Sequence, residues 1–286
     1  MSFLKALTLG VLALSQFTHA IPFPTHNPHE AHKQSSLEPS AGSNSQSKLE
    51  KRSIFNVDRI PDTGEKAALT QGLKDAVAVA KMALAKMDDD KHKDKVSQWF
   101  GPSADHPPVV KQVFQNFVGG GGANEFGPVV VWDVDYGRRG GRPFCLATDA
   151  QGKSGTAYFW PRRGRPGMHF CPKFFGRKNA RDYVADGCGN VSANIDTETV
   201  GRAFQGANVL HEFMHYDKVG LEAVGEQIGD FAYGAYDCFD LQNDRVKLGD
   251  RKTTKNADNY VHFAMHIWLT ETCGRDFAYP RGEEDN

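Results

Sequence analysis

The sequence feature that most constrains the fold is the pentapeptide at residues 211–215, which reads His-Glu-Phe-Met-His. On an α-helix, His211 and His215 lie on one face, because residues four apart have neighbouring side chains. Two imidazoles placed in this way can bind one metal ion at about 2.0–2.1 Å. Glu212 then lies beside a water on that ion and can accept its proton. The pentapeptide therefore predicts a helix that carries a metal site.

The residues that flank the pentapeptide favour such a helix. Apolar side chains recur there at three- and four-residue steps, which predicts a stripe that faces a core. This stripe consists of Val200, Phe204, Ala207, Leu210 and Met214. His211 and His215 border the stripe, so we expect them to point inward or into a cleft. The alternative is a helix with two ordinary surface histidines.

The N-terminal part of the chain has the pattern of a secreted precursor. Residues 1–20 combine a positive start, a short apolar run and a small-residue cleavage site, which predicts a signal peptide. Residues 21–52 are polar, lack apolar periodicity and end in a dibasic pair, which predicts a disordered pro-segment with a processing site. Residues 53–286 would then be one mature domain, secreted and extracellular.

Charge and hydropathy exclude two classes of partner. The formal net charge is −1, which argues against binding to nucleic acid through its phosphates. The apolar run of the signal is too short to cross a bilayer, and no later segment is long enough. We therefore expect no nucleic-acid or membrane partner. We also expect the protein to be a monomer.

The five cysteines fit an oxidising compartment, in which they predict two disulfides and one unpaired thiol. Cys145 could pair with Cys171 across a sheet, and Cys188 could pair with Cys273 or Cys238. Asn190 begins a glycosylation sequon, which matters only if the chain is secreted.

Periodicity predicts further elements along the mature part. Helical spacing of apolar residues indicates helices over 65–87, 107–118 and 257–270. Short β-branched and aromatic runs indicate strands over 129–136, 156–160 and 168–171. The last helix carries His262 and His266, also four residues apart. Because no acid lies between them and no third ligand is near in the sequence, this pair is more typical of a packed helix face.

A catalytic zinc needs a third protein ligand and an open position for water. The extended pattern with a glycine and a third histidine fails, since Lys218 and Leu221 occupy those positions. Asp217 is too close along the same helix to converge easily, whereas Glu222 and Glu226 remain possible by chemistry alone. The nearby carboxylates to be considered are Asp217, Glu222, Glu226 and Asp230.

Several motifs, in order, resemble the deuterolysin-type fungal zinc metalloendopeptidases, also called aspzincins. Residues 228–234 (Ile-Gly-Asp-Phe-Ala-Tyr-Gly) resemble the family segment that follows the metal-binding helix. Residues 256–264 (Asn-Ala-Asp-Asn-Tyr-Val-His-Phe-Ala) resemble a second family motif. The resemblance covers most of residues 65–275. It implies Asp230 as third zinc ligand and Tyr233 as the tyrosine that assists the transition state.

The chain also departs from the family pattern. The interval from His215 to Asp230 is longer than expected, so an insertion must loop out before the aspartate. Lysine-specific members carry a second acid three residues after the aspartate of the Asn-Ala-Asp motif, where this chain has Val261. Asp258 alone could still bind a basic substrate side chain. With the predicted elements, the resemblance implies a zincin-like α+β fold, mostly helical with a small antiparallel sheet.

The leading hypothesis is a secreted zinc endopeptidase that hydrolyses protein or peptide substrates. One Zn²⁺ would be held by His211, His215 and Asp230, with Glu212 as general base and Tyr233 as oxyanion donor. The alternative is a secreted zinc-binding protein, scavenging metal or contacting a surface partner, that hydrolyses nothing. The presence of Glu212 favours the enzyme, because a metal binder has no need of that carboxylate.

Overall fold

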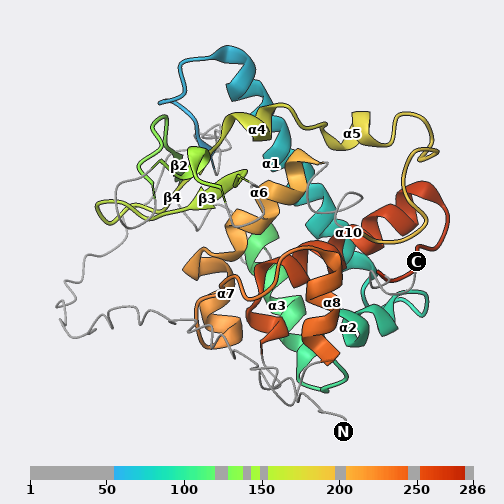
Figure 1. The fold of residues 1–286 in the computed structure, drawn as a ribbon. Helices are drawn as coiled ribbons and strands as arrows, with labels where there is room; N and C mark the ends of the chain where they lie inside the picture. Colours follow the sequence, from blue (N-terminus) through green and yellow to red (C-terminus); the bar gives the residue numbers. More distant parts are fainter. Residues whose placement is uncertain are drawn as a thin grey trace, which may run out of the picture. The chain divides into compact units, whose positions relative to one another are not determined.

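The computed structural model describes residues 55–119, 128–137, 143–148, 154–196, 204–243 and 252–280, all of them in one compact unit, Leu49–Asn286 (Figure 1). Helices make up about half of this part. The longer ones are α1 (Thr63–Lys86), α2 (Lys93–Phe100), α3 (His106–Val118), α6 (Gln205–Met214), α7 (Asp217–Val224), α8 (Ala235–Asn243) and α10 (Ala257–Cys273). Short helices are α4 (Pro172–Phe175) and α5 (Ala180–Tyr183), with 3₁₀ turns η2 (Phe144–Leu146) and η4 (Thr253–Lys255). Within the described ranges, no helix has the length and apolar character that a membrane span requires.

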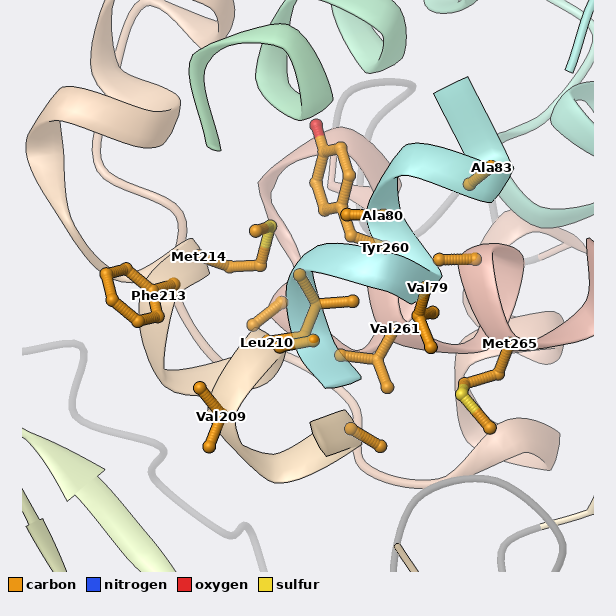
Figure 2. Close-up of a cluster of buried hydrophobic side chains, with 14 of the residues drawn as sticks. Val79, Ala80, Ala83, Val209, Leu210, Phe213, Met214, Tyr260, Val261 and Met265 are labelled. Atoms are coloured by element: carbon orange, nitrogen blue, oxygen red, sulfur yellow. The ribbon is translucent and has the colours of Figure 1, made fainter. Parts of the chain in front are cut away.

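The core forms where α1, α6 and α10 pack together. α1 begins at Asp62, whose side chain accepts a hydrogen bond from the Glu65 amide at 2.8 Å. Its buried face is rich in small residues, which lets α6 approach closely. Figure 2 shows Ala80 of α1, Leu210 of α6 and Val261 of α10 meeting in this core.

The helix α10 is buried over nearly its whole length. Every residue from Ala257 to Thr270 is buried, polar ones included. A helix that is enclosed on all sides belongs to the centre of the fold rather than to its surface. Its first turn is therefore a fixed point against which neighbouring loops can be positioned.

The sheet is small and mixed, not antiparallel as the sequence predicted. Its strands are β1 (Phe55–Asn56), β2 (Val129–Val131), β3 (Ala157–Phe159) and β4 (Gly167–Phe170), in the order β1-β2-β4-β3. β3 and β4 are antiparallel because a short hairpin joins them. β1 pairs with β2, and β2 with β4, in parallel. Parallel β1–β2 pairing needs a long crossover, which α1 to α3 supply. The predicted combination of helices with a small sheet is confirmed, and helices make up about half of the described residues.

The cysteines form two disulfides, as predicted. Cys145 pairs with Cys171, and Cys188 pairs with Cys273. The fifth cysteine, Cys238, is buried and free. Of the two partners left open for Cys188, the structure selects Cys273.

The close contact of α1 and α6 gives a first prediction, for Gly206→Ala. A Cβ there would lie 2.7 Å from Asp75 Cβ and 2.9 Å from the Ala76 nitrogen, so α1 would have to move. This crowding outweighs the gain in helix propensity, and we expect a loss of about 1–3 kcal/mol in the free energy of unfolding, measured with denaturant. Gly176→Ala is the control, because its nearest atom is 3.8 Å away, and it should change stability by less than about 0.5 kcal/mol. Equal effects of the two changes would contradict this account.

Candidate metal centre

The two histidines of the pentapeptide converge at the end of α6. His211 lies in the last turn, and His215 is the C-terminal cap, whose backbone is still in the helical region. The Nε2 atoms of His211 and His215 are 3.2 Å apart. Both rings therefore point to one place, as the four-residue spacing predicts.

The loop after α7 brings Asp230 to the same place. Asp230 Oδ1 lies 3.2 Å from His211 Nε2 and 3.3 Å from His215 Nε2. The sequence predicted that an insertion loops out between His215 and Asp230. In the structure, helix α7 occupies most of this interval instead. The reversal of the chain after α7 passes through Gly225, which has a positive φ of 84°.

The first turn of α10 holds this loop in position. Gly229 exchanges backbone hydrogen bonds with the chain at Lys255 and Ala257. The Asn256 side chain accepts hydrogen bonds from the amides of Phe231 and Ala232 at 2.7 and 3.1 Å. Asp230 is therefore fixed from the residues on both sides of it.

The distances within this cluster fit a zinc ion. Two ligands at about 2.0–2.1 Å from a tetrahedral ion lie about 3.3 Å from each other. The three measured separations among His211, His215 and Asp230 are 3.2, 3.2 and 3.3 Å. Two imidazole nitrogens and one carboxylate oxygen are also ordinary zinc donors. The three side chains could thus hold Zn²⁺ with little rearrangement.

The outer nitrogens of both rings are fixed by acceptors. His211 Nδ1 lies 2.6 Å from Asp258 Oδ1, and His215 Nδ1 lies 3.0 Å from the Ile228 carbonyl. Since an ionised carboxylate and a carbonyl only accept, both Nδ1 atoms donate, and both Nε2 lone pairs face the shared position. Such outer hydrogen bonds orient metal-binding histidines and raise their basicity.

The charges around the cluster are tightly coupled. Burial lowers the pKa of His211, but the carboxylates of Asp258 and Asp230 outweigh it and raise that pKa well above its usual value. Burial raises the pKa of Asp230, but the neighbouring His215 and His211 hold it well below the usual value. The site therefore favours positive charge at its centre, which either protons or a metal ion can supply.

The other predicted site residues lie close to this cluster. Glu212, on α6 between the two histidines, is 4% exposed and contributes to raising the pKa of His215. Tyr233 is 51% exposed, and its ring stacks on His211 at a centroid distance of 6.2 Å. Asp258 was predicted to bind substrate. Its two carboxylate oxygens bond to His211 and to the Gly234 amide at 2.8 Å, a positioning role that the sequence did not suggest.

The competing carboxylates lie elsewhere. Glu226 is exposed and forms an ion pair with Lys255. Glu222 and Asp217 are exposed on α7. Of the four carboxylates that the sequence left open, Asp230 is the one that the structure brings to both imidazoles.

The chain was compared with family models, with curated proteins and with solved structures. No family model matches the chain, and no curated protein matches it. Among solved structures it is similar to a zinc peptidase from Grifola frondosa, with 20% identity, a TM-score of 0.45, and coverage of 72% of this chain and 96% of that one.

The geometry predicts that zinc binding depends on Asp230 and not on Glu226. Asp230→Ala removes one of three converging donors, so zinc affinity should fall by more than about 100-fold, the upper end for changes to outer-sphere partners. Glu226→Ala is the matched control, because Glu226 lies between His215 and Asp230 in the sequence but is exposed, and this variant should bind zinc as the parent does. The measurement is competition with a chelator of known affinity. Loss of zinc in the Glu226 variant alone would show that Glu226, and not Asp230, is the third ligand.

Proposed function

We propose that this protein is a secreted, zinc-dependent endopeptidase that acts on proteins or peptides. The observation that carries the proposal is the convergence of His211, His215 and Asp230 at distances that fit one zinc ion, beside Glu212. Three protein ligands leave one position for water, which is the arrangement of a catalytic zinc rather than a closed structural one.

The proposed chemistry is hydrolysis of a peptide bond. A zinc ion bound there would lower the pKa of a coordinated water to about 7 and polarise the substrate carbonyl. Glu212 accepts the proton of the attacking water and later donates it to the leaving amine. Its place directly after His211 on α6 and its burial support this role, because they hold the carboxylate beside the position where the water would bind.

The proposal gives two further residues a role in peptide hydrolysis. Tyr233, half-exposed and stacked on His211, donates its hydroxyl proton in a hydrogen bond to the oxyanion that develops on the substrate. Asp258 positions His211 through Nδ1 and keeps its Nε2 lone pair directed inward. Contact between Asp258 and a basic substrate side chain stays a prediction, and its carboxylate is only 12% exposed.

Secretion and processing complete the proposal. The predicted signal peptide (1–20) and pro-segment (21–52) lie outside the described residues. The two disulfides support an oxidising compartment, since such bonds are rare in the reducing cytosol.

The central test is Glu212→Gln, which keeps the shape of the side chain but removes the base. We expect zinc content to stay at the parent level and hydrolysis of denatured casein to fall by about 10²–10⁴-fold. Glu222→Gln, an exposed glutamate on α7, is the matched control and should cleave at the parent rate. Parent-level activity of the Glu212 variant would refute the assigned base. A parent protein that binds zinc but cleaves nothing, with or without chelator, would establish the alternative of a metal-binding protein.

Tyr233→Phe tests the proposed oxyanion donor. Because one hydroxyl is lost without change in ring packing, kcat should fall by about 10²–10³-fold while zinc content is unchanged. Tyr236→Phe removes the hydroxyl of a neighbouring tyrosine, 44% exposed, and serves as control with unchanged kcat. An effect on KM alone would show that Tyr233 binds substrate rather than stabilising the transition state.

A further inference from the structure

A second cluster of metal-binding side chains lies against the candidate metal centre. Cys238 on α8 and Asp258 and His262 on α10 each present one donor atom, and these three atoms lie within 4.8 Å of one another. Cys238 and His262 are fully buried, and Asp258 is 9% exposed. Asp258 connects the two clusters, because its Oδ1 contacts His211 Nδ1 and its Oδ2 faces His262.

His262 is unusual among the buried histidines of α10. Within the described part of the chain, neither of its ring nitrogens has a hydrogen-bond partner. His266, one turn later, has both nitrogens satisfied, by Trp99 Nε1 at 3.3 Å and by the Phe277 carbonyl at 3.1 Å. A buried polar group without a partner is costly, so it needs an explanation that packing alone does not give.

The ring of His262 is held ready to bind a ligand. Trp99 stacks on it at a centroid distance of 5.5 Å and an interplanar angle of 14°, which fixes the plane of the imidazole. Because neither ring nitrogen is hydrogen-bonded among the described residues, the neutral imidazole can offer a lone pair to an ion.

Cys238 supplies the second donor. Four of the five cysteines form disulfides, which leaves Cys238 as the one free thiol. The Asn256 amide donates a hydrogen bond to its sulfur at 3.3 Å, a contact that stabilises a thiolate. The thiol itself donates a hydrogen bond to the Ala232 carbonyl at 3.7 Å, and a metal ion would have to take the place of that proton.

The separations leave room for one small ion. His262 Nε2 and Asp258 Oδ2 are 3.9 Å apart, about 0.6 Å more than the roughly 3.3 Å between two nitrogen or oxygen ligands of tetrahedral zinc. Oδ2 already accepts the Gly234 amide, but each carboxylate oxygen has a further lone pair. Small side-chain rotations would bring the three donors into contact with an ion.

We propose that Cys238, Asp258 and His262 bind a second zinc ion, which is buried beside the candidate metal centre and connected to it through the hydrogen bond from His211 to Asp258. Thiolate, imidazole and carboxylate together suit zinc better than the hard cations magnesium and calcium, which prefer oxygen ligands alone. Because a thiol binds zinc as the thiolate, metal binding would displace the Cys238 proton. This site does not depend on peptidase activity and goes beyond it.

The test is metal stoichiometry combined with cobalt spectroscopy on the full secreted protein. Elemental analysis should give two zinc ions per chain for the parent and one for Cys238→Ser. After zinc is replaced by Co²⁺, the parent should show a thiolate-to-cobalt charge-transfer band in the near ultraviolet. Because Cys238 is the one free thiol, this band has a single possible source, and Cys238→Ser should abolish it.

Two histidine variants provide the matched pair. His262→Gln should lose the charge-transfer band and one zinc ion, whereas His266→Gln, at an equally buried position one turn away, should keep both. One zinc per parent chain with no thiolate band would overturn the proposal. This measurement is made on the parent protein, so it does not depend on whether a variant folds. Persistence of the band in His262→Gln would also overturn it. Glu212→Gln should retain both ions, so the result is independent of the proposed catalytic base.

Discussion

The first turn of α10 is the constraint on which the candidate site depends. It is anchored in the core, because the whole helix is enclosed by α1, α2, α6 and α8. From this fixed point Asn256 holds the amides that follow Asp230, and Asp258 holds both His211 and the Gly234 amide. The ligand loop is therefore positioned by hydrogen bonds to a buried helix rather than by its own conformational preferences. This arrangement matters because donors must be held within a fraction of an ångström to favour one metal geometry.

Part of this arrangement could be predicted from the sequence. The pair His211 and His215 follows from helical spacing, which is a local property of the chain. The choice of Asp230 over Glu226 did not follow from spacing and rested on a family resemblance. The role of Asp258 toward His211 was missed, since 47 residues separate them and no periodicity connects such distant positions. The local sequence predicts the geometry within one helix or strand, whereas contacts between elements depend on how the elements pack.

The sheet and the histidines of α10 illustrate the same limit. A strand pattern shows which residues alternate but not the direction of the neighbouring strand, so the parallel pairing of β2 with β1 and β4 could not be anticipated. His262 and His266 have the spacing of His211 and His215, and the sequence assigned both to a packed face. For His266 this is correct, because its hydrogen bonds are satisfied inside the protein. His262 differs only through its neighbours. Asp258 lies one turn earlier on α10, and Cys238 lies on α8.

The carboxylate of Asp258 lies between the two clusters, and its burial must be compensated from both sides. Its pKa is raised by burial but lowered more by His211, His262 and the Gly234 amide, so the carboxylate is ionised. A buried carboxylate is stable only when positive charge or hydrogen-bond donors surround it. On one side His211 fulfils this role with a proton on Nδ1. On the other side the Gly234 amide donates to Oδ2 at 2.8 Å, while the nearest nitrogen of His262 is 3.9 Å away and makes no hydrogen bond. A cation between Asp258 and His262 would add positive charge beside the carboxylate and give the imidazole a partner, which is why we assign the unusual polarity of this core to metal binding rather than to packing.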